Sequence, residues 1–326
     1  MSAPLLEVRD LRTHFPVRGG VLMRARAVNR AVDGVSLRLE AGETLGLVGE
    51  SGCGKSTLGK TLVRLLEPTS GEILFEGREI GGLSRRDMRP LRPELQMVFQ
   101  DPAESLNARH TVRDLLAEPL VIHGRGDAAE RERRVKELLE LVGLPAAAAD
   151  RFPFEFSGGQ RQRIGIARAI ALSPKLVICD EPVSALDVSI QSQIMNLLLD
   201  LQRELGLAYL FIAHDLAVVK HVSDRIGIMY LGRIVETGAA DALYADPRHP
   251  YTRALIAAIP TPDPRRRTER AVLSGDVPSP IAPPPGCPFH PRCPHAEARC
   301  SAERPELREV ASDDGVVHRV ACHFDL

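Results

Sequence analysis

Residues 49–57 read Gly-Glu-Ser-Gly-Cys-Gly-Lys-Ser-Thr and complete the pattern G-x-x-x-x-G-K-[ST]. An apolar run, Thr44 to Val48, precedes them, and a segment with leucines at helical spacing, Ser56 to Leu66, follows. This order of strand, loop and helix is the context in which the pattern binds phosphate. The glycines let backbone N–H groups turn toward phosphate oxygens, Lys55 reaches the β- and γ-phosphates, and Ser56 offers a hydroxyl to Mg2+. The stretch therefore predicts a phosphate-binding loop.

The size and charge of the chain set the class of protein in which this loop lies. The chain has 326 residues, of which 44% are hydrophobic and 26% charged, with a formal net charge of −1. This length exceeds the ~100–200 residues of a usual domain, so we expect one large domain with an addition, or two domains. The balanced charge gives no sign of a nucleic-acid partner. No apolar run reaches the ~18 residues of a membrane span and the N-terminus lacks a signal-peptide layout, so we expect a cytosolic protein that can dock on a membrane protein.

The part of the chain before the loop contains two predicted strands, Leu6 to Leu11 and Val35 to Glu40. In the second, apolar residues at 35, 37 and 39 alternate with polar residues at 36, 38 and 40. The segment between them, Pro16 to Arg30, carries glycines and four arginines and is interpreted as a surface loop, with a contact surface as the alternative. Phe15 could stack on an adenine ring, and packing in the core explains it equally well.

After the loop the pattern becomes helical and then alternates between strands and helices. Apolar residues recur at three- and four-residue spacing from Thr111 to Leu144, which predicts a helical insert. Further on, apolar strands alternate with helices, which indicates a mostly parallel sheet covered on both faces. The predicted elements are the helix Arg161 to Leu172, the strand Leu176 to Cys179, the helix Asp187 to Leu205, the strand Ala208 to Ala213, the helix Leu216 to Val222 and the strand Arg225 to Leu231.

The strand at Leu176 to Cys179 runs directly into two acidic residues, Asp180 and Glu181. A buried strand that delivers a carboxylate near a phosphate loop is a common way to support Mg2+, so Asp180 is a candidate outer ligand. Glu181 is placed to take a proton from an attacking water.

A third motif, Phe156-Ser157-Gly158-Gly159-Gln160, precedes a predicted helix. Ser157 is a plausible helix cap, and Gly158 and Gly159 would let backbone N–H groups approach a γ-phosphate. Taken alone, the pentapeptide is explained equally well as an ordinary capped helix start.

The order of these features resembles the ATPase subunit of an ABC transporter over roughly residues 5 to 240. The resemblance implies an α/β fold: a P-loop NTPase (RecA-like) with a mostly parallel sheet core, an antiparallel β subdomain, a helical subdomain and a small cysteine-containing extension. The implied domains are a nucleotide-binding domain at 1–246, with its helical subdomain at about 101–157, and an extension at 247–326. The motifs that carry the resemblance are Gly49–Thr57, Gln100, Ser157–Gln160, Asp180-Glu181, Ser184-Ala185-Leu186-Asp187 and His214.

In this family two ATPase subunits face each other head to tail, so each ATP lies between the loop of one and the signature of the other. The resemblance implies that ATP is bound by Gly49, Glu50, Ser51, Gly52, Cys53, Gly54, Lys55, Ser56 and Thr57, with Phe15 as a further candidate. It implies that the signature acting on the partner's ATP is Ser157, Gly158, Gly159 and Gln160, and that Asp187 communicates across the interface. The implied catalytic residues are Lys55, Gln100, Glu181 and His214, and the implied Mg2+ ligands are Ser56, Gln100 and Asp180.

Two cysteines lie inside these motifs. Cys53 fits as a small residue in the loop, and a reactive thiol is the alternative because a nearby helix start lowers thiol pKa. Cys179 is most simply a small buried hydrophobic residue.

The C-terminal part of the chain is rich in proline and cysteine. Its stretches His249 to Leu255 and Gly275 to Pro285 resemble the tail of ATPase subunits that serve dipeptide and oligopeptide importers, including relatives for nickel and other small solutes. Relatives with this tail carry a [4Fe-4S] cluster, which the resemblance implies here too. Zinc and unligated thiols are the alternatives from the residues themselves. The candidate ligands are Cys287, Cys293, Cys300 and Cys322.

Together these features predict the ATP-hydrolysing subunit of a dipeptide or oligopeptide importer, peripheral on the cytoplasmic side of the cell membrane. The expected cofactors are ATP and Mg2+. The expected partners are a second, related but non-identical ATPase subunit, two transmembrane permease subunits and, indirectly, an extracellular substrate-binding protein. The alternatives are import of nickel or another small solute, a soluble ABC ATPase outside transport, a regulatory module that hydrolyses ATP poorly, and an exporter.

Overall fold

The structure of the chain is a computed structural model, and it describes residues 3–19, 24–101, 105–184, 186–259, 275–310 and 317–325. The chain divides into two compact units, each of which is treated separately below. Unit 1 comprises Met1–Arg38, Leu45–Gly81 and Ala213–Leu326, and unit 2 comprises Leu39–Thr44 and Gly82–Ile212.

An antiparallel sheet of unit 1 has the strand order β2-β1-β4-β5. Strand β1 (Leu6–Gly19) runs against β4 (Ser70–Phe75), with Leu6 opposite Phe75 and Arg9 opposite Glu72. Leu6, Val8 and Leu11 are buried, whereas Arg9 is exposed. The apolar side chains of the predicted first strand therefore lie on its covered face, and the register shift between Arg9 and Arg12 accounts for the burial of Leu11 beside Leu6 and Val8.

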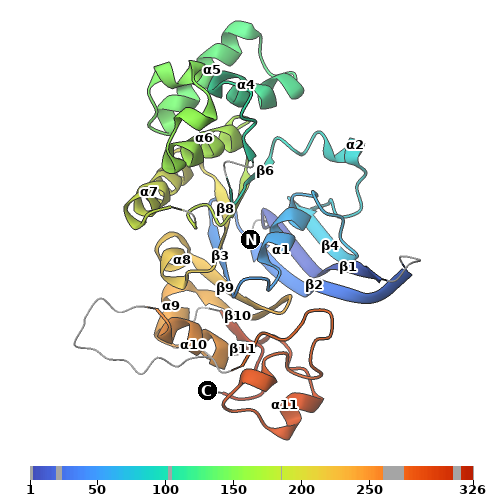
Figure 1. The fold of residues 1–326 in the computed structure, drawn as a ribbon. Helices are drawn as coiled ribbons and strands as arrows, with labels where there is room; N and C mark the ends of the chain where they lie inside the picture. Colours follow the sequence, from blue (N-terminus) through green and yellow to red (C-terminus); the bar gives the residue numbers. More distant parts are fainter. Residues whose placement is uncertain are drawn as a thin grey trace, which may run out of the picture. The chain divides into compact units, whose positions relative to one another are not determined.

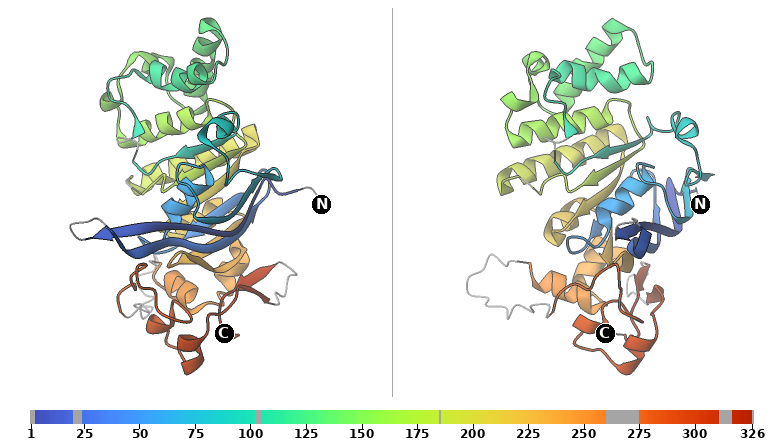
Figure 2. Two further views of the ribbon diagram at one scale, coloured as in Figure 1. Left: turned by 90° about the vertical axis from the view of Figure 1, so that its right-hand side faces the viewer. Right: turned by 45° about the vertical axis from the view of Figure 1, so that its right-hand side comes forward.

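The segment interpreted as a surface loop is instead part of two long strands. Strand β1 continues to Gly19, and β2 (Arg24–Leu39) begins ahead of the predicted start at Val35. Figures 1 and 2 show the two strands side by side over much of their length. Exposure alternates from Arg26 to Arg30 along β2, so the arginines fit a two-stranded ribbon. The glycines and charges indicated a loop because few apolar residues alternate with the polar ones in this segment. Residues 20–23 lie outside the described residues.

A second sheet in unit 1 carries the phosphate loop at the end of one strand. Strand β3 (Thr44–Val48) is parallel to β9 (Arg225–Tyr230), with Val48 opposite Ile228. Strands β10, β12 and β11 continue this sheet in antiparallel pairs. The remaining bounds in unit 1 are α1 (Lys55–Leu62), β5 (Arg78–Glu79), α8 (Leu216–Val222), β10 (Arg233–Ala239), α9 (Ala240–Ala245), α10 (Pro250–Ala257), the 3-10 helix η3 (His290–Arg292), α11 (Ala298–Ala302), β11 (Arg308–Val310) and β12 (His318–Val320).

Unit 2 contains three parallel strands and a group of helices. In β7 (Leu176–Asp180) and β8 (Ala208–Ala213) every residue is buried, as expected for strands covered on both faces. Figure 1 shows α4, α5 and α6 together in green. The remaining bounds are α2 (Arg85–Met88), β6 (Leu95–Val98), α4 (Val112–Ile122), α5 (Ala128–Leu141), the 3-10 helices η1 (Ala146–Asp150) and η2 (Pro153–Glu155), α6 (Gly158–Ile170) and α7 (Val188–Leu205).

The fold class predicted from the sequence is confirmed. Parallel pairs β3–β9 and β6–β7–β8, the antiparallel sheet and the helices between β6 and β7 are all present. Among the described residues, none of the helices has both the length and the apolar character needed to cross a membrane.

Candidate nucleotide site

The phosphate loop joins β3 to α1 in unit 1 and is tightly packed against neighbouring backbone. Gly54 precedes α1 with φ of 108°, in the region that favours glycine. A Cβ at Gly54 would lie 1.9 Å from the carbonyl oxygen of Ala31, and one at Gly49 would lie 2.1 Å from the carbonyl oxygen of Met229. Both positions therefore require glycine, because the obstructing atoms are backbone and cannot move aside cheaply.

Lys55 is the buried cation of this loop, with only 4% of its surface exposed. Its Nζ donates to the carbonyl oxygen of Gly49 at 2.7 Å and to that of Glu50 at 3.1 Å. The ammonium thus lies at the centre of the loop, where the sequence placed it for phosphate binding. Its present partners are neutral carbonyls, which an anionic phosphate can outcompete.

The thiol of Cys53 also lies in this loop and is buried. Burial raises the pKa of Cys53 despite the opposing charge of Lys55. Burial therefore favours the neutral thiol, which supports the interpretation of Cys53 as a small residue of the loop over that of a reactive thiol. Burial likewise raises the pKa of Cys179, with the charge of Asp180 adding to the effect. Cys179 is fully buried, as expected for a small apolar residue.

Two residues that the sequence did not indicate contact the second residue of the loop. The hydroxyl of Tyr251 accepts a hydrogen bond from the backbone N–H of Glu50 at 2.9 Å. Arg292 donates to both carboxylate oxygens of Glu50, at 2.7 and 3.0 Å. Both lie more than 200 residues further along the chain, so no local pattern could have revealed them.

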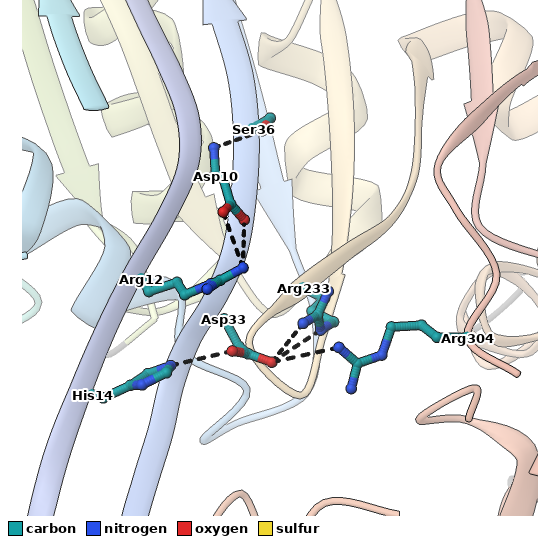
Figure 3. Close-up of polar contacts among 7 residues, drawn as sticks. All are labelled: Asp10, Arg12, His14, Asp33, Ser36, Arg233 and Arg304. Atoms are coloured by element: carbon teal, nitrogen blue, oxygen red, sulfur yellow. Dashed lines mark hydrogen bonds and ion pairs between the residues drawn. The ribbon is translucent and has the colours of Figure 1, made fainter. Parts of the chain in front are cut away.

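Asp33 connects β2 with other parts of unit 1, as Figure 3 shows. Its carboxylate accepts from Arg233 at 2.6 Å, lies 3.2 Å from His14 Nε2 and lies 3.9 Å from Arg304. Burial alone would raise the pKa of Asp33, but the hydrogen bonds and charges of Arg233 and His14 outweigh it and keep the pKa below its usual range. The backbone N–H of Asp33 donates to the carbonyl of Gly232, and its carboxylate binds the next residue, Arg233. Both contacts help fix the turn after β9.

The turn after β9 in turn contacts the loop. The backbone N–H of Gly232 donates to the carbonyl oxygen of Cys53 at 2.8 Å. The phosphate loop is therefore held by backbone from the turn after β9 as well as by side chains from the C-terminal part of unit 1.

In unit 2, β7 ends at Asp180 and delivers Glu181, as the sequence predicted. Asp180 is buried, and Glu181 adopts φ of 46°, a conformation uncommon for residues other than glycine. Gln100 Nε2 donates to Glu181 Oε2 at 2.9 Å, and the backbone N–H of Glu181 donates to the carbonyl of Ile212 at 2.9 Å. The structure therefore joins two of the predicted catalytic residues and fixes the backbone that carries the carboxylate.

The signature motif, also in unit 2, begins α6 with a reciprocal cap. Ser157 Oγ accepts from the N–H of Gln160, and Gln160 Oε1 accepts from the N–H of Ser157. The predicted cap at Ser157 is confirmed, and the side chains of both residues are exposed. A Cβ at Gly159 would lie 2.5 Å from Ile190 Cγ2 of α7, so a glycine suits this close approach.

The remaining predicted residues take these places. In unit 1, Phe15 is a partly exposed residue of β1, and Ser56 and Thr57 lie in the first turn of α1. His214 follows β8 directly and is exposed. In unit 2, Asp187 precedes α7, and Ala185 lies outside the described residues.

The four C-terminal cysteines are free thiols in one segment of unit 1. The N–H of Cys287 donates to the carbonyl oxygen of Cys300 at 2.8 Å. Burial, helped by the neighbouring thiols of Cys300, Cys322 and Cys293 and opposed by a hydrogen bond with the Phe289 backbone, raises the pKa of Cys287 to about 11. Among the described residues, however, no group of three or more His, Cys, Asp or Glu side chains is arranged to hold a metal ion. The expected cluster, or zinc, is therefore not confirmed.

Comparison with known proteins decides the family. Residues 32–184 match the ABC transporter family, and residues 235–300 match the C-terminal region of oligopeptide/dipeptide transporters. The chain is 53% identical over 323 residues to the oligopeptide transport ATP-binding protein AppF of Bacillus subtilis (strain 168), covering 98% of this chain and 97% of AppF. This chain belongs to the ATP-binding subunits of the ABC transporter family, in its dipeptide/oligopeptide importer branch. A probable peptide ABC transporter ATP-binding protein, y4tS of Sinorhizobium fredii (strain NBRC 101917 / NGR234), is 54% identical over 99% of this chain and 90% of its own length.

Solved structures of other ABC ATPases share the fold. The ATP-binding cassette MJ0796, in a dimeric post-hydrolysis state bound to ADP and Pi, matches with a TM-score of 0.65 and 28% identity, over 72% of this chain and 98% of its own. CbiO1 from Clostridium perfringens, part of the ABC transporter complex cbiONQ, matches with a TM-score of 0.65 and 29% identity, over 74% of this chain and 91% of its own. These matches extend the family assignment from sequence to three-dimensional structure.

Proposed function

We propose that this chain is the ATP-hydrolysing subunit of an ABC importer that powers the uptake of dipeptides or oligopeptides across the cytoplasmic membrane. The observation that carries the proposal is the hydrogen bond from Gln100 to Glu181 at the end of β7, in a chain that also holds a complete phosphate loop. A module that only bound ATP would not need an oriented carboxylate at this position. The matched C-terminal region and the peptide-transport names of the relatives support the substrate class.

In the proposed reaction each unit contributes different chemistry. Lys55 exchanges its carbonyl partners for phosphate oxygens and balances charge on the γ-phosphate, with His214 as a second donor. Glu181 accepts a proton from the attacking water, and Gln100 fixes the orientation of that carboxylate. Ser56, Gln100 and Asp180 would hold Mg2+, which supplies charge neutralisation on the phosphates when bound.

The exposed signature residues are proposed to act on another chain. Ser157 and Gln160 each accept a hydrogen bond from the backbone N–H of the other, within the first turn of α6. Both side chains are exposed, so the start of this helix is accessible to a ligand. The dimeric state of MJ0796 supports a paired arrangement. The proposed partners are a related ATPase subunit, two transmembrane permease subunits and, indirectly, a substrate-binding protein, with this chain peripheral on the cytoplasmic side of the membrane.

A [4Fe-4S] cluster or zinc at the four C-terminal cysteines is proposed as a separate feature. It is supported by four free thiols within one segment, but their arrangement in the structure is not that of a metal site. No step of the reaction is derived from it. An absorption band near about 400 nm in anaerobically purified protein is expected for the cluster, and metal analysis would detect zinc instead.

The substitution Glu181→Gln in the assembled transporter tests the main proposal. It removes the proton acceptor but keeps the shape of the side chain, so ATP turnover should fall on the order of a hundredfold or more while ATP remains bound. Glu204→Gln is the matched control, because Glu204 is an exposed residue in the last turn of α7. Turnover of the Glu181→Gln transporter equal to that of the control would contradict the proposal.

A further inference from the structure

Glu50, the second residue of the phosphate loop, is held at each of its polar groups. Its N–H donates to the Tyr251 hydroxyl at 2.9 Å, and its carbonyl accepts from Lys55 Nζ at 3.1 Å. Its carboxylate receives two hydrogen bonds from Arg292, at 2.7 and 3.0 Å. The conformation of the loop at Glu50 is therefore set jointly by the ATP-binding lysine and by two residues from the end of the chain.

The environment of Arg292 makes its ion pair with Glu50 a partly buried one. Its side chain is only 4% exposed, and the Glu50 side chain is 26% exposed. The guanidinium lies over the ring of Tyr230 at 5.9 Å, and Tyr230 in turn contacts the rings of Tyr251 and Phe289 at 4.8 and 5.3 Å. The hydrogen bonds to Glu50 raise the pKa of Arg292, so its guanidinium remains charged. These aromatic contacts fix the position of the guanidinium, and its paired hydrogen bonds therefore fix the position of the Glu50 carboxylate.

Arg292 is also fixed to the cysteine segment. It ends the 3-10 helix η3, which lies between Cys287 and Cys293. The N–H of His290 donates to the carbonyl of Cys287 at 3.1 Å, and the N–H of Cys293 donates to the carbonyl of His290 at 3.3 Å. The N–H of Arg292 donates to the carbonyl of Phe289 at 3.0 Å. A change in the backbone between the two cysteines would therefore displace the guanidinium from Glu50.

The charge of Glu50 gives this contact a consequence for nucleotide binding. The loop must receive the negative phosphates of ATP, yet its second residue is a carboxylate. An uncompensated carboxylate so close to the phosphates would repel them, and the repulsion is strong where water is partly excluded. Arg292 supplies the compensating positive charge. Among the contacts of the described residues, no cation of the motif itself binds the Glu50 carboxylate.

We propose that Arg292 is a positioning residue of the nucleotide site: it neutralises and orients Glu50, so that the cysteine segment sets the affinity of the phosphate loop for ATP. The proposal rests on the loop being an ATP site, as set out above. It assigns to the C-terminal segment a role in ATP binding that is separate from substrate choice.

The test measures ATP affinity of the purified full chain by titration with ATP in the presence of Mg2+. Arg292→Ala should weaken ATP binding roughly tenfold, because the carboxylate of Glu50 is left uncompensated beside the phosphates. Arg292→Lys, which keeps the charge but not the paired hydrogen bonds, should lose less. The matched control is Arg299→Ala in α11 of the same segment, because Arg299 pairs with Glu303 at the surface and both are 61% exposed; its affinity should equal that of the wild type.

The double variant Arg292→Ala/Glu50→Gln separates a charge effect from damage to the fold. If Arg292 acts by neutralising Glu50, removal of the carboxylate should restore most of the lost affinity, whereas a folding defect would persist or worsen. Thermal unfolding of each variant reports the fold independently. If Arg292→Ala does not fold, Glu50→Gln still tests the charge: with the carboxylate gone and Arg292 still cationic, ATP affinity should equal or exceed that of the wild type, and a loss would contradict the inference.

The outcomes distinguish the inference from the function on which it rests. Wild-type chain that does not bind ATP would overturn the proposed function. Wild-type chain that binds ATP, with equal affinity in folded Arg292→Ala protein, would overturn the inference alone. The same follows if the double variant binds no better than Arg292→Ala.

Discussion

The phosphate loop and the signature motif both present glycine-rich backbone at the start of a helix, yet they are supported very differently. The loop before α1 is held by distant parts of the chain: Tyr251 and Arg292 bind Glu50, and backbone atoms of Ala31 and Met229 leave no room for a side chain at Gly54 and Gly49. The signature before α6 is capped by its own Ser157 and Gln160, whose side chains are exposed.

This difference indicates what each motif does before ATP arrives. A loop that is fixed by many contacts pays little further entropy to bind phosphate, which suits a primary nucleotide site. A helix start with a local cap and exposed side chains keeps its N–H groups available to a ligand brought by another chain. The loop is supported by contacts within unit 1, whereas the signature in unit 2 is proposed to act on a partner's ATP.

The largest effect that separates the two motifs is expected from Ser157→Asn. Asparagine is a good helix cap, so α6 should keep its start, but the hydroxyl proposed to act on the partner's ATP is lost. ATP affinity of the isolated chain should stay within about twofold of the wild type, while turnover of the assembled transporter should fall on the order of tenfold to a hundredfold. Nucleotide titration of the chain and ATPase assays of the transporter measure the two quantities.

Ser157→Ala is the companion variant, because it removes the hydroxyl and the cap together. It should lower turnover similarly and also lower the free energy of unfolding by about 1 kcal/mol, a loss that Ser157→Asn should largely avoid. A drop in ATP affinity of the isolated chain in either variant would break the comparison, since it would place the signature in the chain's own ATP site.

Local motifs made most of the fold and the central site residues predictable. The loop pattern located β3 and α1, the acidic strand end located Asp180 and Glu181, and a serine before a predicted helix located the cap at Ser157, because each depends on neighbours within a few residues. The long strands β1 and β2 were missed in part, since charged residues on the exposed side of a ribbon read as loop.

The contacts that complete the loop could not be predicted, because they join residues far apart in the sequence. Arg292 lies 242 positions from Glu50, and the pairing depends on how the C-terminal segment packs. Its flanking prolines and cysteines indicated a metal site and gave no indication of a partner for the loop. The sequence held two indirect signals of this contact: a carboxylate, Glu50, inside a phosphate-binding motif, and an arginine, Arg292, between two cysteines. Neither signal names the other residue as its partner.

A smaller effect, specific to the loop side of the comparison, concerns the stability of the region that holds Tyr251. His249 is buried, and its Nδ1 accepts a hydrogen bond from the backbone N–H of Tyr251 at 3.1 Å. The backbone N–H of His249 donates to the buried carboxylate of Glu236 at 3.0 Å. Burial lowers the pKa of His249 to about 4, although the charge of Glu236 opposes the shift. His318 binds the same carboxylate at 2.8 Å, so His249 is one of two imidazoles near this acid.

The lowered pKa has a definite consequence for stability as a function of pH. Between its usual pKa of 6.5 and about 4, His249 takes up a proton in the unfolded chain but not in the folded one. Its neutral form therefore stabilises the fold above pH 6.5, and this contribution is lost as the pH falls toward 4, by about 1 kcal/mol over the first unit below 6.5. His249→Asn keeps a side-chain acceptor for the N–H of Tyr251 and cannot titrate. Denaturant unfolding at pH 7.5 and 5.5 should show the free energy of unfolding of the wild type falling more than that of His249→Asn, by roughly 1 kcal/mol. Since Glu236 and His318 remain in both proteins, an equal fall in the two would mean that His249 is not the neutral, buried group that positions Tyr251 beside the phosphate loop.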